Sequence, residues 1–491
     1  RGTKLIIIDP RKQSLSRYST HHLQFNPGQD LALLNAIIYI IIKEHLYDED
    51  YINNHTEGFD VLKKEIESLD FNSLSNLCGV NSELIKNVAR IYAKAKSSII
   101  FWGMGISQHV HGTQNAFSLI NLSLITGHVG KPGTGLHPLR GQNNVQGASD
   151  AGLIPMSFPD YKSVNEQDYK FEMQKFWDTP LDFDEGKTVV EIIDAIYNNE
   201  IKGLYVQGEN PAMSDPDQMH TRKALAKLEH LVVQDIFMTE TAWNADIILP
   251  ATAHAEKTGT YTNTNRQVQL GRAVVNSPSN VRQDWWIIQE IANRMGLSWK
   301  YNSPRDIFLE MKLVMPSLNN ITWERLESDG FVTYPVKNPS EPGEEIIFTD
   351  GFPTTNSLAK IIPVKILGPN EDIDKDFPFI LSTGRMLEHW HTGTMTRKSF
   401  VLNDIEPEPI IFMNYDDSRK LKLDLTKKIF IETRRGKISI KVRLDENLLS
   451  GMIFLPFCFK EAAANILTKS DLDPIGKIPE LKFSAAKVYQ N

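Results

Sequence analysis

The sequence predicts an α/β protein in which Rossmann-like, parallel-sheet domains come first and a β-barrel domain follows. Two observations predict the first part: short apolar runs of strand length alternate with segments of helical periodicity, and the runs end in polar turns marked by glycine or proline. The barrel is predicted because, from Phe377 onward, closely spaced strand patterns replace the helical ones.

The first predicted strand stands at the very start of the chain. The sequence has no initial methionine and enters directly into the apolar run Lys4–Asp9, which is typical of a core parallel strand. Because a domain rarely begins inside its own sheet, we expect further sequence in front of Arg1. Processing, a cloning boundary, or a split or disrupted gene would each account for its loss.

Helical patterns follow this strand. Leu31–Leu46 has helical length, and Asn81–Lys96 places Leu84 and Val88 on one apolar face. A short apolar run, Ser98–Trp102, then ends at a glycine. Strand and helix therefore alternate, which predicts a parallel sheet with crossover helices.

The same alternation returns in the middle of the chain. Three strands are predicted at Leu204–Val206, Leu231–Val233 and Asp246–Leu249. The polar stretch Tyr161–Lys187 predicts loops or short helices, and the later part of Asn302–Asn370 predicts a connection between domains.

A β domain is predicted at the end of the chain. Ile429–Thr433 and Lys437–Leu444 flank the turn Arg434–Gly436 and predict a hairpin, and Met452–Phe457 adds another strand. These strands predict a barrel.

Composition limits the class of protein. The chain has 491 residues, a hydrophobic share of 41%, a charged share of 23% and a formal net charge of −8. Such a length corresponds to roughly three or four globular domains. The negative charge argues against nucleic acid as the main partner, because affinity for nucleic acid depends on clustered Lys and Arg.

Cysteine content and hydropathy bear on the compartment. The two cysteines, Cys78 and Cys458, predict a reducing, cytoplasmic environment and form no Cys-x-x-Cys pair for a cluster or structural zinc. The apolar run Leu31–Ile42 is shorter than about 18 residues and contains Asn35 and Tyr39, so it predicts a buried helix rather than a membrane span. We expect no signal peptide.

Candidate ligand-binding residues stand at the ends of the predicted strands. In open parallel sheets ligands bind beyond the carboxyl ends of the strands. Those ends carry Gly103-Met104-Gly105, Gln207–Asn210 and Gln234-Asp235, which could share one cleft. The first of these lacks the third glycine of a dinucleotide fingerprint, and Gly130-Lys131 lacks the upstream glycine of a P-loop.

Two aspartates near the start of the chain are further candidates for ligand binding. Asp9 and Arg11 follow the first strand, and Asp30 precedes a helix. Asp30 could be an N-cap. Equally, an aspartate at a strand end could accept hydrogen bonds from a ribose or a guanine edge.

The segment Arg140–Gly147 combines one cation, carboxamides and glycines with almost nothing suited to a core. The fork of an arginine pairs with carboxylate or phosphate, and glycines let the backbone approach a ligand. The alternative is a polar loop whose amides satisfy their own turns.

Two later segments are also polar. Glu256–Arg266 suits phosphate and ribose recognition, although an ordinary Thr/Asn-rich turn region would look the same. Ser382–Arg397 contains His389 and His391, which could share a strand face and bind a metal. Because no carboxylate or thiolate stands at ligand spacing, hydrogen bonding to a heterocycle or phosphate is the preferred interpretation.

Together these segments resemble the molybdopterin-dinucleotide oxidoreductases, most closely the catalytic alpha subunit of formate dehydrogenases. The likeness runs through nearly all of the chain, and Arg140–Asn144 favours formate dehydrogenases over nitrate reductase relatives. It is carried by Leu136–Asp150, Gly208–Pro211, Gln234–Thr241, Glu256–Arg266, Glu388–Arg397, Glu461–Asn465 and Leu472–Pro474.

The resemblance implies a two-electron oxidation of formate to carbon dioxide at a molybdenum or tungsten ion held by two pterin guanine dinucleotides (bis-molybdopterin guanine dinucleotide) in a cleft between the domains. It implies that Arg140 pairs with the formate carboxylate, with Gln142 beside it. The dinucleotide-lining residues that it implies are Gly103, Gly105, Gly208, Glu209, Asn210, Gln234, Asp235, Thr262, Asn263, Arg266, Thr383, His391, Thr392, Thr394 and Asn465.

The chain departs from the family pattern at its front. Family members carry a four-cysteine cluster motif and a metal-ligating cysteine or selenocysteine followed by histidine, all upstream of the region that begins here. We therefore expect the 4Fe–4S cluster on a missing N-terminal part, in the same subunit or in another chain, and assign no metal ligand here. The electron-transfer partner stays open.

Two other classes of function remain as alternatives: a non-catalytic scaffold or cofactor-binding subunit, and an inactive truncated product. Retention of Arg140 favours the enzyme.

Four domains are predicted: 1–142, an α/β dinucleotide-binding domain incomplete at its N-terminus; 143–262, a second α/β domain; 263–365, a smaller connecting segment; and 366–491, a β-barrel that binds the molybdopterin dinucleotide.

Overall fold

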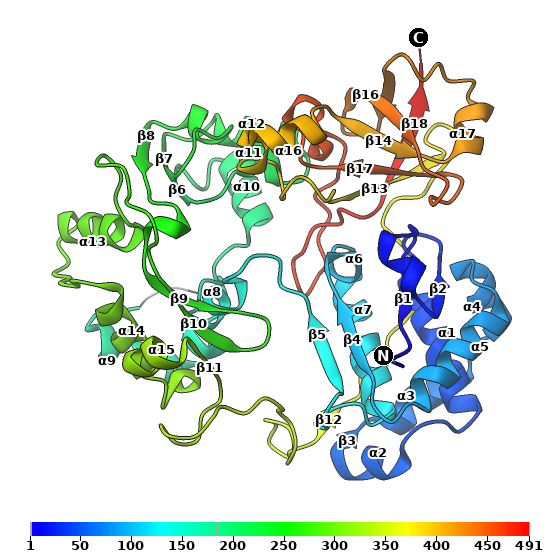
Figure 1. The fold of residues 1–491 in the computed structure, drawn as a ribbon, viewed down its shortest axis with the longest axis horizontal. Helices are drawn as coiled ribbons and strands as arrows, with labels where there is room; N and C mark the ends of the chain where they lie inside the picture. Colours follow the sequence, from blue (N-terminus) through cyan, green and yellow to red (C-terminus); the bar gives the residue numbers. More distant parts are fainter. Residues whose placement is uncertain (1, 182–183, 491) are drawn as a thin grey trace. The chain divides into compact units, whose positions relative to one another are not determined.

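The computed structural model describes residues 2–181 and 184–490 of the chain (Figure 1). The chain forms two compact units. The first consists of Arg1–His137, Ala212–Arg222 and Phe348–Asn491, and the second of Pro138–Pro211 and Lys223–Ile347. Each unit is therefore built from segments that are separated in the sequence.

An apolar helix, α1 (Asp30–Lys43), forms the centre of the helical part of the first unit. No charged residue lies between its first and last positions, so every face of the helix can be buried. The helices that pack against it are α3 (Phe59–Glu67), α4 (Phe71–Cys78), α5 (Ser82–Ala93) and α7 (Gly112–Ile125). The two helices predicted near the start of the chain are confirmed, with slightly shorter bounds.

Helix α5 begins where side-chain capping predicts. Oδ1 of Asn81 accepts hydrogen bonds from the backbone N–H groups of Glu83 and Leu84, at 2.9 and 3.3 Å. These donors have no partner inside the helix, so the cap stabilises its first turn. The shorter helices of this part are α2 (Glu49–His55) and α6 (Met104–Ser107).

Outside the barrel, strands of the first unit pair two by two. β1 (Ile6–Ile8) runs parallel to β2 (His21–Leu23), β3 (Thr56–Glu57) runs parallel to β12 (Ala359–Lys360), and β4 (Ile99–Trp102) pairs with β5 (Gly135–Pro138). The predicted parallel first strand is confirmed, but its predicted place in a core is wrong, because Ile8 is 40% exposed. In the described part of the chain β1 pairs with β2 alone, so it is an edge strand and not a central one.

Six strands of the first unit close into a barrel, drawn in yellow to red in Figure 1. Their order is β13–β17–β14–β16–β15–β18. The bounds are Phe379–Gly384 for β13, Ile410–Met413 for β14, Ile429–Glu432 for β15, Lys437–Leu444 for β16, Met452–Pro456 for β17 and Ser484–Tyr489 for β18. Two short helices, α16 (Phe400–Ile405) and α17 (Tyr415–Lys420), lie in its connections.

The predicted hairpin is confirmed in its register. β15 and β16 are antiparallel, with Glu432 opposite Lys437. Along β16, Ile438 and Ile440 are buried while Lys437 and Ser439 are exposed, as the two-residue period of a strand requires. The inward-facing apolar side chains of all six strands form the core of the barrel.

The second unit contains the three strands predicted in the middle of the chain. β6 (Gly203–Gln207), β7 (His230–Asp235) and β8 (Ile247–Pro250) form a parallel sheet. An antiparallel sheet is formed by β9 (Gly259–Thr262), β10 (Gln267–Gly271) and β11 (Phe331–Thr333). Parallel sheets together with the closed C-terminal barrel confirm the predicted fold class.

Helices accompany both sheets of the second unit. Their bounds are Val145–Asp150 for α8, Gln167–Trp177 for α9, Val189–Tyr197 for α10, Asp284–Arg294 for α13, Pro304–Val314 for α14 and Trp323–Asp329 for α15. α11 (Pro211–Ser214) and α12 (Gln218–Leu225) link the two units along the chain. The prediction of loops or short helices over Tyr161–Lys187 is confirmed by α9, except that residues 182–183 lie outside the described residues.

The helices over residues 2–181 and 184–490 fall short of the length and hydropathy that crossing a membrane requires.

Candidate functional site

The carboxyl ends of β6 and β7 bring two predicted segments together in the second unit. Parallel pairing sets Gln207 opposite Gln234. Gly208 follows with φ +63°, and its N–H donates to the Gln234 carbonyl at 2.8 Å. The buried Gln234 side chain accepts from the Tyr205 hydroxyl and donates to Asp284 at 2.7 Å. The backbone of this sheet edge is therefore fixed from both strands.

Two carboxylates, Glu209 and Asp235, lie at this edge. Partial burial raises the pKa of each, and a neighbouring carboxylate raises it further: Asp235 acts on Glu209, and Asp284 acts on Asp235. Asp235 also accepts backbone hydrogen bonds from Ile236 and Phe237, at 2.6 and 3.2 Å. Clustered acceptors of this kind favour a ligand that brings N–H donors.

The Asn210 side chain links the segment after β6 to the segment after β7. Its Nδ2 donates to Glu240 at 2.9 Å, and its Oδ1 accepts from the backbone N–H and hydroxyl of Thr241, at 3.1 and 2.9 Å. Asn210 is 6% exposed, so these hydrogen bonds are buried beside Glu209.

Arg140 and Gln142 lie on an exposed loop that precedes α8. The Arg140 N–H donates to the Thr264 hydroxyl at 3.3 Å, and Oδ1 of Asn144 accepts from the Thr262 N–H at 2.9 Å. Over the described residues, no hydrogen bond or ion pair engages the Arg140 guanidinium. The loop is thus held by the Arg140 backbone and the Asn144 side chain, while the Arg140 guanidinium is available to an anion.

A polar network lies beside this loop. Gln146 donates to Asp150 at 2.7 Å and to the Tyr161 hydroxyl at 3.2 Å, and the Tyr334 hydroxyl donates to Asp150 at 2.8 Å. Burial, followed by the charge of Asp150, raises the pKa of both tyrosines, while the nearby Arg140 acts on Tyr161 in the opposite sense. Both phenols are therefore neutral hydrogen-bond donors near neutral pH.

Thr262 ends β9, and Asn263 and Arg266 belong to the turn between β9 and β10. Arg266 adopts φ +61°, and its guanidinium donates to the backbone carbonyls of Tyr334 and, at 3.0 Å, Glu344. Burial lowers its pKa. These contacts assign Arg266 to holding the turn in place.

Gly103 and Gly105 follow β4 in the first unit. Gly103 has φ −133°, and Gly105 lies inside α6. A Cβ added at either position would meet no protein atom within 4 Å. Among the described residues, the space beside both glycines is therefore open.

Arg11, after β1, is engaged with the barrel. Its Nε donates to Asp445 at 3.2 Å, and its guanidinium carbon lies 4.7 and 4.4 Å from the ring centroids of Phe412 and Phe454. Asp9 accepts from the Arg11 N–H at 2.8 Å, and burial raises its pKa. These contacts hold the first loop against the barrel.

Asp30 is the first residue of α1. The expectation that it is an N-cap is wrong, because Gln29 occupies that position. The Asp30 carboxylate is buried beside His109 and His111, and burial raises its pKa.

A group of cations gathers at the end of β13. The Thr383 hydroxyl donates to the Leu481 carbonyl at 2.7 Å, and the half-buried Lys482 donates to the Thr383 carbonyl at 2.7 Å. Burial, reinforced by Arg385, lowers the pKa of Lys482 to about 8. In the described part of the chain no carboxylate lies within ion-pair distance of Lys482 or Arg385. Neighbouring cations without a counter-ion suit an anionic ligand.

His389 and His391 do not share a strand face, so the metal interpretation loses its geometric basis. Both follow β13 in an irregular segment, and His391 has φ +53°. His389 Nε2 lies 2.8 Å from the Glu406 carbonyl oxygen. Burial, together with the charge of Arg385, lowers the pKa of His391, so its imidazole is neutral near pH 7.

The remaining predicted residues of the barrel domain lie in its connections. The hydroxyls of Thr392 and Thr394 are 3.2 Å apart. Asn465 donates to the carbonyls of Met213 and Ser214, at 3.2 and 2.6 Å. Asn465 therefore ties the segment after β17 to α11.

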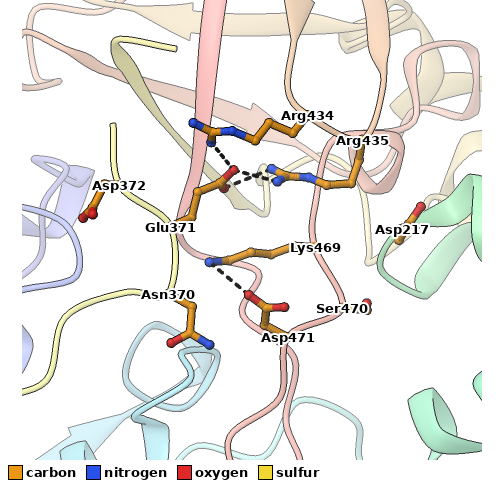
Figure 2. A pocket seen from close by; sticks show the side chains of 9 residues that line it. All are labelled: Asp217, Asn370, Glu371, Asp372, Arg434, Arg435, Lys469, Ser470 and Asp471. Carbon is orange, nitrogen blue, oxygen red and sulfur yellow. Dashed lines mark hydrogen bonds and ion pairs between the residues drawn. The ribbon is translucent and has the colours of Figure 1, made fainter. Parts of the chain in front are cut away.

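A polar pocket of about 460 Å³ in the first unit is lined by other residues (Figure 2). Figure 2 shows Glu371 between Arg434 and Arg435, and Lys469 paired with Asp471. Because these charges neutralise one another and no predicted site residue lines the pocket, we do not assign it to the candidate site.

Sequence reasoning missed Lys482 and the Asp150 network. The sequence signal for Lys482 was a single lysine between Leu481 and the mostly apolar strand β18, where a charged side chain is unexpected. Asp150 and Tyr334 are far apart in sequence, so no local pattern could pair them.

The family model described as molybdopterin oxidoreductase matches residues 1–294, and the molydopterin dinucleotide binding domain model matches residues 379–485. The F₄₂₀-dependent formate dehydrogenase subunit alpha of Methanocaldococcus jannaschii is 46% identical over 490 residues, which are 99% of this chain and 72% of that protein. Formate dehydrogenase H of Escherichia coli is 34% identical, covering 99% and 69%.

Other relatives carry other activities in their names. The assimilatory nitrate reductase catalytic subunit of Bacillus subtilis is 33% identical, covering 99% of this chain and 70% of that protein. Among solved structures, acetylene hydratase from Pelobacter acetylenicus matches with a TM-score of 0.79 and 20% identity, covering 100% of this chain and 74% of that one. At this identity the likeness concerns the fold.

Proposed function

The chain belongs to the molybdopterin oxidoreductase family, and we propose that it is the C-terminal portion of a molybdenum- or tungsten-dependent formate dehydrogenase. In the proposed reaction formate loses its hydrogen as a proton and two electrons, and carbon dioxide is released. One observation carries the proposal: over residues 2–181 and 184–490 no hydrogen bond or ion pair engages the Arg140 guanidinium, while Thr262 and Thr264 hold the loop that presents it.

The side chains fit a molybdopterin dinucleotide cofactor. Lys482 and Arg385 offer positive charge, and in the described part of the chain neither forms an ion pair with a carboxylate, which suits the phosphates of the cofactor. Glu209 and Asp235 offer acceptors for the N–H donors of a guanine edge. The open space at Gly103 gives ligand atoms room beside the backbone.

For the cofactor-lining residues that the family resemblance implies, the contacts suggest two roles. We propose that Gly105, Gly208, Thr383, His391, Thr392 and Thr394 line the dinucleotides, together with the residues just named. Asn210, Gln234, Thr262, Asn263, Arg266 and Asn465 are proposed to hold the lining segments in position, because their side chains or backbone already bond to neighbouring segments. Asp9 and Arg11 hold the loop after β1.

Arg140 is proposed to bind the substrate. A guanidinium pairs with a carboxylate through two parallel hydrogen bonds, which fixes the direction of the formate C–H bond as well as its position. Gln142, two residues on, offers a further donor and acceptor. A bound cofactor would supply a metal able to take up two electrons.

We further propose that an N-terminal part, in the same subunit or a second chain, supplies the 4Fe–4S cluster and the cysteine or selenocysteine that binds the metal. The length difference from the Methanocaldococcus jannaschii relative supports this, because this chain covers 72% of that protein. Cytoplasmic location is proposed from Cys78 and Cys458, which are buried and unpaired.

The test is to produce the chain together with such an N-terminal part in a host that makes the cofactor. Formate-dependent reduction of a viologen dye, and nitrate-dependent oxidation of the reduced dye, are then measured beside pterin, molybdenum and tungsten content. Formate turnover supports the proposal. Nitrate turnover alone would replace it with a nitrate reductase, and bound cofactor with neither activity would favour a scaffold subunit.

A further inference from the structure

A buried carboxylate, Asp150, belongs to the helix that follows the Arg140 loop in the second unit. Asp150 is 4% exposed and ends α8. Its Oδ1 accepts from Nε2 of Gln146 at 2.7 Å, and its Oδ2 accepts from the Tyr334 hydroxyl at 2.8 Å. Over residues 2–181 and 184–490, no Lys, Arg or His side chain lies within ion-pair distance of Asp150. Neutral donors therefore satisfy this carboxylate.

Tyr161 completes the group of donors around Asp150. Nε2 of Gln146 also donates to the Tyr161 hydroxyl at 3.2 Å. After burial and the charge of Asp150, a hydrogen bond with Asp150 raises the pKa of Tyr161 further. Asp150 thus has hydrogen-bonding partners on α8, on the loop after α8 and on the segment after β11. Since a carboxylate has about four acceptor positions, these partners leave it little capacity for another donor.

The backbone that carries Tyr161 is strained. Asp160 and Tyr161 both have φ +58°, in the left-handed region that residues with a Cβ rarely adopt. Asp160 is held there by Ser317, whose N–H and hydroxyl donate to the Asp160 carboxylate at 2.8 and 2.5 Å. Strain of this kind persists where the surrounding structure imposes it, and it gathers at functional sites. Here it brings the half-exposed Tyr161 phenol to the first turn of α8.

Tyr161 lies within electrostatic reach of two opposite charges. Burial has the largest effect on its pKa and raises it; the charge of Asp150 raises it further, and the charge of Arg140 lowers it. Opposite charges attract, and a guanidinium pairs well with a carboxylate. Among the described residues, however, no hydrogen bond or ion pair engages the Arg140 guanidinium. The lack of a pair between Arg140 and Asp150 therefore needs a physical cause.

Arg266 is a second cation near this network, because its charge acts on Tyr334. Its guanidinium already donates to the backbone carbonyls of Tyr334 and Glu344. Of these two arginines, Arg140 is therefore the one whose guanidinium is available to Asp150.

We propose that Tyr161 is a positioning residue for the reaction proposed above: by occupying Asp150, its phenol keeps that carboxylate from pairing with Arg140. The guanidinium then stays available to the substrate anion. This inference rests on the proposed function for the identity of the anion. Without the phenol, Arg140 would be shared between Asp150 and the substrate. Only molecules with an unpaired Arg140 would bind substrate, so the apparent affinity would fall by that fraction, while an occupied site would turn over as before.

The first experiment measures steady-state kinetics of the enzyme complete with its N-terminal part. In Tyr161→Phe, KM for formate should rise by about tenfold while kcat stays within about twofold of the wild type. Adding Asp150→Asn to Tyr161→Phe should return KM to within about threefold of the wild type, because a neutral carboxamide does not attract the guanidinium. The control is Tyr415→Phe, at a 52% exposed tyrosine in α17, which should match the wild type.

The second experiment needs no turnover. Phenylglyoxal modifies arginine, and mass spectrometry of the peptide that contains Arg140 gives the rate at that residue. A neighbouring carboxylate stabilises the protonated guanidinium and so slows its modification. The rate should fall by about tenfold in Tyr161→Phe and recover when Asp150→Asn is added. A wild type that does not oxidise formate would contradict the proposed function, and these rates would still decide the role of Tyr161.

Tyr334→Phe removes the other phenolic donor from Asp150 and replaces Tyr161→Phe in both experiments if that variant does not fold. The same rise in KM and the same slower modification of Arg140 are expected. An unchanged KM with an unchanged Arg140 rate would overturn the inference. A loss of kcat that Asp150→Asn does not relieve would also overturn it, because Tyr161 would then have a structural role alone.

Discussion

Lys482 donates a 2.7 Å hydrogen bond to the backbone carbonyl of Thr383, which is a neutral acceptor. Burial, reinforced by Arg385, lowers the Lys482 pKa to about 8, from an ordinary value of 10.5. In cofactor-free protein the folded state thus loses this proton at lower pH than the unfolded state does. Between about pH 8 and 10.5 the unfolded state binds more protons, so this lysine makes the free energy of unfolding rise with pH.

Replacement of Lys482 by methionine should remove that rise. We predict that the wild-type minus Lys482→Met difference in free energy of unfolding, measured by urea denaturation without cofactor, increases from pH 8 to 10. Lys427→Met, at an exposed lysine near Asp424, should follow the wild type. A wild-type minus Lys482→Met difference that does not change with pH would show that Lys482 is not destabilised by its surroundings.

Arg140→Ala should abolish most formate turnover with the cofactor retained. Loss of a charge-assisted contact to the reacting group costs roughly 10²–10³-fold in rate, and among the described residues the guanidinium has no hydrogen bond or ion pair to lose. The measurement is formate-dependent dye reduction normalised to pterin content. Arg294→Ala, at an exposed arginine paired with Glu290 in α13, should stay within twofold of the wild type. Near-normal turnover in Arg140→Ala would remove Arg140 from substrate binding.

Asn144→Ala should impair turnover indirectly. The Asn144 carboxamide accepts from the Thr262 N–H and so ties the Arg140 loop to β9. We expect KM for formate to rise by about tenfold, because a mobile loop loses conformational entropy when the substrate orders it. Asn144→Asp, which keeps the accepting oxygen, should recover most of the loss. If both variants behave alike, the hydrogen bond is not what positions the loop.

Gly105→Ala should separate folding from cofactor binding. Alanine is favoured over glycine within a helix by roughly 0.5–1 kcal/mol, and its methyl group would meet no protein atom within 4 Å. The cofactor-free protein should therefore melt at the same temperature as the wild type or higher. Pterin content after purification should nevertheless fall, because the methyl group occupies space proposed for the ligand. Full pterin content would show that no ligand approaches Gly105.

Elements with a local signal could be predicted from the sequence. The apolar run of α1, the three strands β6, β7 and β8, and the hairpin of β15 and β16 each carry their own periodicity, and all were found. The four-domain division is not tested by these elements and stays a prediction.

Features that depend on distant residues could not be predicted. Ile8 looked like a core residue because its neighbours are apolar, yet its exposure depends on how many strands join the sheet. Asp30 looked like a cap or an open acceptor, and its burial depends on His109 and Glu480, which no local pattern connects to it. Tertiary environment decided these positions.

The contact of Arg11 with Asp445 spans 434 positions of the chain. A contact between residues so distant in sequence costs loop-closure entropy before its own favourable free energy is gained. Such contacts therefore slow folding. On the ribosome, the loop after β1 cannot reach its barrel partner until Asp445 has been synthesised. The apolar surface of Phe412 and Phe454 that covers Arg11 is also made late. The loop after β1 must therefore wait through most of translation before its barrel partners exist.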